Sequence, residues 1–118
     1  MPRFTVLLHD SPRGLHYDLL LETGDVLRTW ALPQPPDVAV EMACEALPDH
    51  RLHYLEYEGP VSDGRGTVAQ WDRGTYEIQR QGETELAVKL AGEKLVGQAV
   101  LQRSSEDPQS WQFSFRRD

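Results

Sequence analysis

Turn-forming residues interrupt this chain so often that long helices have little room. Clusters rich in Gly, Pro, Asp and Ser recur at 23–25, 33–36, 59–60, 62–66, 72–74, 81–82, 91–93 and 104–109. The short segments between them are rich in β-branched and aromatic residues, which favour strands. Nine segments are strand candidates: 3–9, 15–22, 26–32, 52–58, 67–71, 75–80, 85–90, 95–103 and 111–116. This spacing predicts a mainly β fold, a compact closed antiparallel β-barrel of about eight strands with one short helix.

The one helix is predicted at 38–47, because this run follows two prolines and Asp37 is suited to the N-cap. Cys44, the single cysteine, falls within it, so an intrachain disulfide is excluded. Cys44 has two interpretations, a reactive thiol or a small buried hydrophobe. We favour the second, because free cysteines usually lie inside proteins.

Composition indicates one globular domain, 1–118, with 39% hydrophobic and 26% charged residues. No apolar run approaches the roughly 20 residues that span a bilayer, and the amino terminus lacks signal-peptide features. We therefore expect a cytoplasmic protein without a membrane partner. The net charge of −7 makes the chain a poor non-specific binder of nucleic acid. Any function on nucleic acid then depends on a small local basic site or on a partner protein.

Two histidines and an aspartate lie close together near the amino terminus. In a strand over 15–22, alternation places His16, Asp18, Leu20 and Glu22 on one face. His9 lies on the preceding segment and can reach the same face. Two imidazoles and one carboxylate suit Zn²⁺, Mn²⁺ or Fe²⁺ and leave coordination positions open. The alternative is a pair of surface histidines beside an exposed carboxylate.

A second polar group surrounds His50, which we expect in a loop before the strand 52–58, with Tyr54 on that strand. A loop histidine is suited to phosphate binding or general-acid catalysis, although most such histidines are simply solvated. Gly64-Arg65-Gly66 is interpreted as a hairpin turn, because no strand-to-helix transition follows it.

The order of these motifs resembles the 3′-phosphoesterase domain of bacterial DNA ligase D. The matching positions are His9, 15–22 (LHYDLLLE), 26–33 (VLRTWALP), Asp49-His50, Tyr54, 57–59 (YEG), 66–68 (GTV), 71–76 (WDRGTY), 95–97 (LVG) and Trp111. The likeness covers nearly the whole chain in the family's order. It implies a compact barrel and an enzyme that trims DNA 3′ ends, removing a terminal ribonucleoside or a 3′-phosphate in non-homologous end joining.

The resemblance also implies roles for particular residues. His9, His16 and Asp18 match the family's metal ligands, with Mn²⁺ as the expected ion and Zn²⁺ or Co²⁺ as alternatives. His50 matches a phosphate-binding histidine and Tyr54 a tyrosine that supports it. The predicted catalytic residues are then His50, Tyr54 and His16.

Three positions depart from the family pattern: Leu20 replaces an arginine, Pro48 a glutamate and Gln34 a lysine. One extra residue also lies between His9 and His16. Leucine cannot clamp a phosphate through charged hydrogen bonds, so an active enzyme would need another cation in place of the missing arginine. Arg13, in the enlarged loop, is the predicted phosphate-binding substitute beside His50, with Arg28 as a second candidate.

Three functions follow from this pattern. The first is a metal-dependent phosphoesterase acting on DNA 3′ ends, as a monomer, with end-repair proteins such as a ligase or polymerase as further partners. The second is a catalytically degenerate binding or scaffold module in end repair, suggested by Leu20 and Pro48. The third is a metal-dependent hydrolase of a small phosphorylated substrate.

Overall fold

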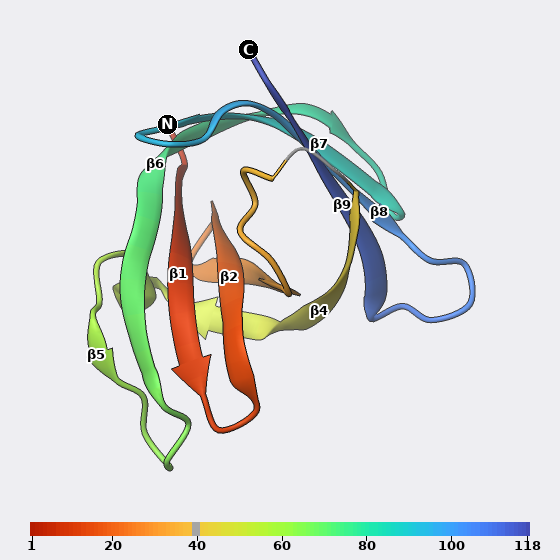
Figure 1. Ribbon diagram of the computed structural model, residues 1–118. Coiled ribbons are helices and arrows are strands. Elements are labelled where there is room, and N and C mark those ends of the chain that lie inside the picture. The colour runs from red at the N-terminus through yellow and green to blue at the C-terminus, as the bar shows by residue number, and fades with distance from the viewer. Residues whose placement is uncertain (39–40) are drawn as a thin grey trace.

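The computed structural model describes residues 1–38 and 41–118 as a ring of antiparallel strands (Figure 1). The elements are β1 (Arg3–Ser11), β2 (Gly14–Thr23), β3 (Val26–Leu32), β4 (Met42–Arg51), the 3₁₀ helix η1 (Leu52–Leu55), β5 (Gly59–Pro60), β6 (Thr67–Gln81), β7 (Glu85–Gly92), β8 (Val96–Arg103) and β9 (Ser110–Arg117). Neighbours follow the order β1-β2-β3-β4-β9-β8-β7-β6, and β6 pairs again with β1. This pairing closes the ring and confirms the predicted mainly β, closed antiparallel fold.

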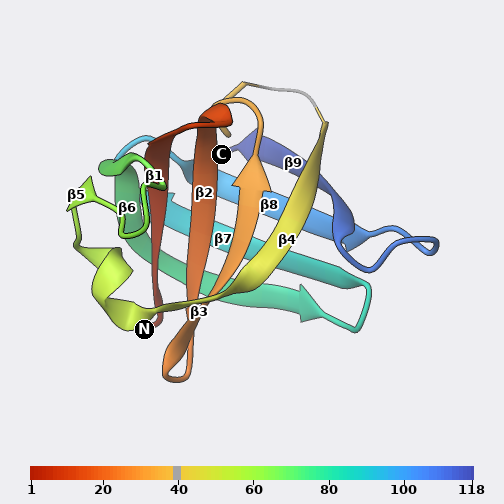
Figure 2. The same ribbon diagram turned by 90° about the horizontal axis from the view of Figure 1, so that it is seen from below.

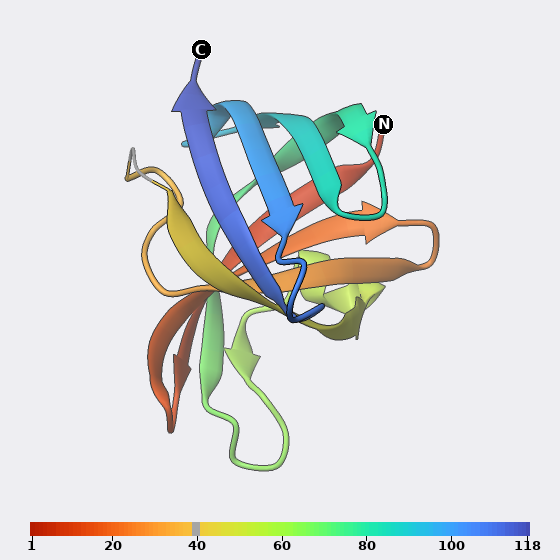
Figure 3. The same cartoon turned by 90° about the vertical axis from the view of Figure 1, so that its right-hand side faces the viewer.

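The short strand β5 stands outside the ring and pairs with β6. Together with η1 it lies against the outer surface of the ring (Figure 2). Figure 3 shows β7, β8 and β9 side by side in one wall, with the β1–β2 and β5–β6 turns projecting together from the opposite end. Two turns far apart in sequence therefore meet at one end of the molecule.

The main core fills the inside of the ring and follows from the period-two alternation of strands. In β9, Trp111, Phe113 and Phe115 are buried, as their alternation with polar residues predicts. Trp111 packs edge-on against Trp30, with ring centroids 5.5 Å apart. Burying each large apolar side chain contributes roughly 2 kcal/mol to stability, so this interior is the main source of cohesion.

A smaller apolar cluster lies on the outer face of β1, β2, β3 and β6. Its buried members are Leu7, Leu20, Leu27, Leu55 and Val68. Leu55 comes from η1, so the helix is held against the ring by this cluster. The outer face of β1 and β2 is thus partly apolar, and the remainder is polar.

The predicted helix at 38–47 is wrong for the residues that the structure describes. Met42 and Cys44 are buried while Ala43 and Glu45 are exposed, which is the alternation of the strand β4. This strand pairs with both β3 and β9 and completes the ring, so tertiary pairing overrides helix propensity. Asp37 lies in a turn, and positions 39 and 40 of the predicted helix are outside the described residues.

The predicted strand at 52–58 is also wrong, because Leu52–Leu55 forms the helix η1. His50, expected in a loop, instead lies near the end of β4, where the chain leaves the ring. Only Leu55 of this helix is buried, and Tyr54, expected on a strand, lies on the helix. The described residues contain one short helix, but at a different position from the one predicted.

The predicted strands at 67–71 and 75–80 are one long strand, β6. No turn interrupts this strand at 72–74. Asp72 and Gly74 pair with β1, and Gly74 also pairs with Gly92 of β7. The buried Asp72 carboxylate accepts backbone hydrogen bonds from Glu93, Lys94 and Leu95, which form the β7–β8 turn.

Among the described residues, no helix is long and apolar enough to cross a membrane.

Candidate functional site

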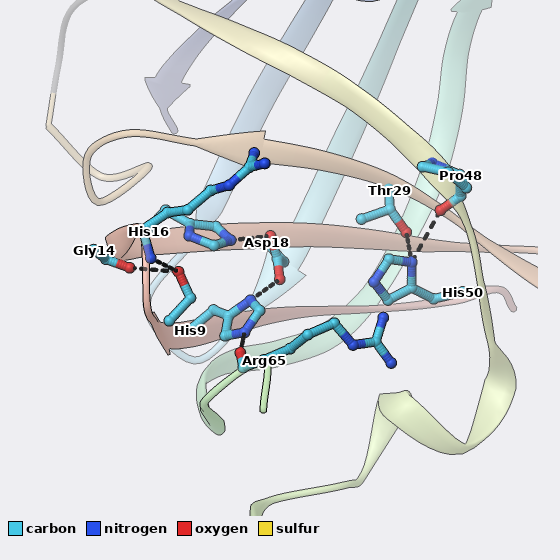
Figure 4. A network of polar contacts seen from close by, with 10 residues as sticks. His9, Gly14, His16, Asp18, Thr29, Pro48, His50 and Arg65 are labelled. Carbon is cyan, nitrogen blue, oxygen red and sulfur yellow. Dashed lines mark hydrogen bonds and ion pairs between the residues drawn. The ribbon is translucent and has the colours of Figure 1, made fainter. Parts of the chain in front are cut away.

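The predicted trio comes together on the outer face of the β1–β2 hairpin. His9 on β1 lies directly opposite His16 on β2, and Asp18 follows two positions later on the same face of β2. The ring centroids of the two histidines are 4.6 Å apart. One ligand atom from each of the three side chains lies within 4.8 Å of the other two. The extra residue in the turn therefore does not prevent the three side chains from converging (Figure 4).

The Asp18 carboxylate is the centre of this group. Its Oδ2 lies 3.2 Å from His9 Nδ1, and its Oδ1 lies 3.1 Å from His16 Nε2. Burial raises the pKa of Asp18, but the contacts of its carboxylate with His16 and His9 outweigh this effect and lower the pKa. The hydrogen bond to Asp18 raises the pKa of His9. The carboxylate is thus kept ionised although it is almost inaccessible to solvent.

The orientation of His9 suits a proton or a metal ion among these side chains. His9 Nε2 lies 2.7 Å from the carbonyl oxygen of Arg65, which only accepts hydrogen bonds, so Nε2 carries a proton. In neutral His9 the lone pair of Nδ1 then faces the Asp18 carboxylate. Asp18 Oδ1 is buried, and the His16 contact does not satisfy hydrogen-bond geometry. A proton or a metal ion between these atoms would remove the repulsion between the Nδ1 lone pair and the carboxylate and would give the buried Oδ1 a partner.

The three side chains fit a divalent metal. Two imidazole nitrogens and one carboxylate oxygen form a donor set suited to Mn²⁺, Zn²⁺ or Fe²⁺. The contact from His9 Nε2 to the Arg65 carbonyl is the kind of outer hydrogen bond that orients histidine ligands in metalloproteins.

A cavity of about 260 Å³ opens beside the trio. Its walls come from β1, β2, the end of β4, η1, the segment between β5 and β6, and the start of β6. The lining residues are Leu7, His9, Asp18, Pro48, Asp49, His50, Arg51, Tyr54, Val61, Arg65 and Val68. His50 and Tyr54, predicted from sequence to act together, both line this cavity with two of the three candidate ligands.

His50 is fixed in one orientation by two oxygen atoms. Its Nδ1 lies 3.0 Å from the carbonyl oxygen of Pro48 and 3.1 Å from Thr29 Oγ1. The Pro48 carbonyl only accepts, and the Thr29 hydroxyl already donates to the carbonyl of Leu27. Nδ1 therefore carries the proton that both oxygens accept, and Figure 4 shows the other ring nitrogen, Nε2, on the side facing Asp18. This arrangement leaves Nε2 available to a ligand in the cavity.

Tyr54 supports His50 from η1. The two rings pack edge-on with centroids 5.5 Å apart and an interplanar angle of 67°. Tyr54 itself stacks against His53 and Tyr57, so an aromatic group borders the cavity on this side. The helix η1 therefore holds the Tyr54 ring against the His50 ring.

Comparison with known proteins places the chain in a family. The family model described as the DNA Ligase D 3′-phosphoesterase domain matches residues 8–103. The chain belongs to this family. It is 38% identical over 113 residues to the multifunctional non-homologous end joining protein LigD of Pseudomonas aeruginosa, covering 87% of this chain and 13% of that protein. The LigD protein of Mycobacterium bovis is 33% identical, covering 88% of this chain and 15% of its own length. The chain thus spans about one seventh of the length of these curated relatives.

Two departures from the DNA ligase D pattern can now be placed. Leu20, at the position of the family's arginine, is fully buried in the small apolar cluster beside the trio. Pro48 contributes its backbone carbonyl to His50, so this hydrogen bond does not depend on the side chain. Pro48 also lies where the β3–β4 register shifts, a position at which a missing N–H is tolerated.

The cations predicted to replace the arginine lie elsewhere. Arg13 is exposed in the β1–β2 turn, where its backbone N–H donates to Ser11 Oγ, and it does not line the cavity. The guanidinium of Arg28 lies 4.9 Å from the ring centroid of Trp30. Phosphate binding by Arg13 stays a prediction.

Sequence reasoning missed Thr29 and Arg65 as members of this site. Gly64-Arg65-Gly66 does form the predicted hairpin turn, closed by the hydrogen bond from Val61 N to the Gly66 carbonyl. Its position beside His9 depends on the pairing of β6 with β1, which no local pattern predicts. Thr29 lies in the matched segment 26–33, but no local pattern places it beside His50, 21 positions away.

Cys44 lies outside this site and is buried, as predicted. Burial raises the pKa of its thiol to about 12. At neutral pH the residue is therefore a protonated core side chain and not a nucleophile.

Proposed function

We propose that this chain is a metal-dependent phosphoesterase that removes a 3′-phosphate or a terminal ribonucleoside from DNA ends. The observation that carries the proposal is the convergence of His9, His16 and Asp18 beside a cavity that His9 and Asp18 line together with His50. Membership of the DNA ligase D 3′-phosphoesterase family supports the same reaction class. Mn²⁺ is the proposed ion, as the resemblance implies.

In this proposal His9, His16 and Asp18 hold the metal. A divalent ion bound there would polarise a phosphate oxygen and neutralise part of its charge. The role of Asp18 is to remain ionised, and the two histidines assist by lowering its pKa. The carbonyl of Arg65 holds the ring of His9 in the orientation that presents Nδ1 to Asp18.

His50 is the proposed proton donor. Because the Pro48 carbonyl and Thr29 hydroxyl hold Nδ1–H, only Nε2 is presented to a bound phosphate. As water attacks the phosphorus and the P–O bond to the leaving oxygen breaks, Nε2–H of the protonated ring would donate to a phosphate oxygen or give its proton to the departing oxygen. Tyr54 keeps the His50 ring in place by edge-on packing.

The test is a primer carrying a 3′-phosphate or a terminal ribonucleotide, incubated with the protein and Mn²⁺. We expect product in wild type and a loss of at least about a hundredfold in His16→Ala and His50→Ala. Glu77→Ala is the control, because Glu77 is exposed on β6 and does not line the cavity. Absence of any product that depends on both the metal and His16 would refute the proposal. A small phosphodiester, tested in parallel, distinguishes DNA from a small-molecule substrate.

The burial of Leu20 favours a second candidate function, a non-catalytic module that binds metal and DNA ends. A buried leucine supplies no charge to a phosphate, and the phosphate-clamping arginine of the family is lost. Mn²⁺ binding and DNA-end binding without turnover would favour this candidate. Turnover that is lost in His50→Ala would exclude it.

A further inference from the structure

The geometry points to Arg65 as the residue that binds the phosphate in this chain, in place of the arginine that Leu20 has replaced. The inference rests on the proposed function, since it assigns a phosphate-binding group to the same cavity. Arg65 lies on the loop between β5 and β6, whereas the family's arginine position lies on β2. The charge would therefore reach the phosphate from a different wall of the cavity.

The loop that carries Arg65 is held tightly against β1. Gly66 has φ +92°, and a Cβ added there would lie 1.9 Å from the carbonyl oxygen of Asp10, so a side chain cannot be accommodated. The Val61 N–H donates to the Gly66 carbonyl and closes the turn. The close approach brings the Arg65 carbonyl to His9, so the backbone of Arg65 is fixed relative to the candidate metal ligands.

The guanidinium of Arg65 is also held in place. Its Nε donates to the Ser62 carbonyl at 2.9 Å, and Nη2 donates to Ser62 Oγ at 3.2 Å. A guanidinium has five N–H groups, so three remain for an anion. Figure 4 shows the side chain running from the loop toward His50, and both residues line the cavity. A preoriented fork of donors on the wall of the cavity is the arrangement that phosphate oxygens favour.

The charges around the cavity suit a phosphate once a metal is bound. Its lining contains the carboxylates Asp18 and Asp49 and the guanidinium groups of Arg51 and Arg65, whose formal charges cancel. A divalent cation on the trio then makes the cavity positive. A terminal phosphate monoester carries about −1.5 to −2 charges at pH 7. Removing Arg65 would lower the local positive charge by a large fraction.

Arg65 therefore has two separable functions. The backbone carbonyl positions His9, and any residue at position 65 can supply it. The guanidinium binds phosphate, and only arginine supplies its planar fork. Substitution should weaken phosphate binding while metal binding survives, which a purely structural role would not predict.

The experiment compares Arg65→Ala, Arg65→Lys and wild type on a 3′-phosphate primer with Mn²⁺, with inorganic phosphate as a competing probe. We expect Arg65→Ala to raise KM for the primer and Ki for phosphate by about tenfold to a hundredfold, and Arg65→Lys to recover part of the loss. The Mn²⁺ dissociation constant should stay within about twofold of wild type. Arg116→Ala is the charge-matched control, because Arg116 is exposed on β9 and outside the cavity.

Several results would overturn the inference. One is that Arg65→Ala has the same KM for the primer and the same Ki for phosphate as the control Arg116→Ala. Another is a loss of Mn²⁺ binding as large as the loss of phosphate binding, which would make Arg65 a structural residue. A third is loss of phosphate binding in Arg13→Ala with none in Arg65→Ala. If wild type has no turnover, the proposed function fails, but calorimetric binding of inorganic phosphate to the Mn²⁺-loaded protein still tests Arg65.

Discussion

The two faces of the β1–β2 hairpin have different properties although they are built from alternate residues of the same strands. The inner face carries Phe4, Val6, Leu19 and Leu21, all buried in the main core. The outer face changes along its length, from the apolar Leu7 and Leu20 to the polar His9, His16 and Asp18. The inner face provides stability, and the rigid ring lets the outer face hold a buried carboxylate between two histidines. Selective damage to one face should therefore leave the other largely intact.

The largest expected effect is in the main core. Phe113 is fully buried on β9, opposite Met42 of β4 and Leu101 of β8. Phe113→Ala should lower the free energy of unfolding by about 3–5 kcal/mol, because it removes apolar burial and leaves a cavity. Urea denaturation measures the loss. A change below about 1 kcal/mol would show that the inner face is not the source of stability.

The next effect concerns the metal. Asp18→Asn keeps the size of the side chain and removes its charge, so the fold should survive. The Mn²⁺ dissociation constant should rise by roughly a hundredfold or more, about 3 kcal/mol, because a carboxylate ligand is lost. Titration calorimetry measures the constant, and Asp49→Asn controls for removal of a neighbouring cavity charge. Equal Mn²⁺ affinity in wild type and Asp18→Asn would contradict the assigned ligand set.

The boundary between the two parts of the outer face is tested at Leu20. Leu20→Ala removes a buried side chain from the small cluster and should cost about 2 kcal/mol of stability. Mn²⁺ affinity should change little, because the three ligands are carried by neighbouring positions of a paired hairpin. Loss of metal binding at temperatures where the variant is still folded would show that the cluster and the site are not independent.

A smaller effect is expected from the support of His50. Thr29→Val replaces the hydroxyl by a methyl group of similar size. His50 Nδ1–H then loses one of its two acceptors and donates only to the Pro48 carbonyl. We expect kcat to fall by about threefold to tenfold, corresponding to roughly 1 kcal/mol, with unchanged Mn²⁺ affinity. Thr29→Ser keeps the hydroxyl and should have wild-type kcat. Identical kcat in Thr29→Val and wild type would remove Thr29 from the catalytic support.

The smallest effect is a pH dependence of the metal-free protein. The hydrogen bond to Asp18 raises the pKa of His9, so its stabilising contribution is fully present below pH 6.5 and is lost as pH rises through the raised pKa. In the presence of a chelator, the denaturation midpoint of wild type should therefore fall above pH 6.5. Asp18→Asn removes the partner and should flatten this part of the profile. If the denaturation midpoint of wild type rose above pH 6.5 relative to that of Asp18→Asn, the stabilising His9–Asp18 pair would be contradicted.

Several features were predictable because they depend on neighbours in sequence. Alternation in 15–22 and 111–116 predicted which side chains share a face. In β2, Leu19 and Leu21 belong to the main core while Leu20 belongs to the outer cluster, and β9 alternates between buried and less buried residues. The motif order predicted the family, and the short β1–β2 turn makes His9 and His16 cross-strand neighbours. The candidate metal ligands could be proposed early for this reason. Residues 42–47 of the predicted helix were misassigned because they favour a helix locally, whereas pairing with β3 and β9 on either side requires a strand.

What sequence alone could establish, then, is the β class, the family and the three candidate ligands, since all three ligands lie on one hairpin. The second half of the site depends on closure of the ring. Pairing of β6 with β1 brings Arg65 to His9, and pairing of β4 with β3 brings His50 to Thr29. These contacts join residues 56 and 21 positions apart. No local periodicity encodes such separations, because they result from packing a complete ring around one apolar core.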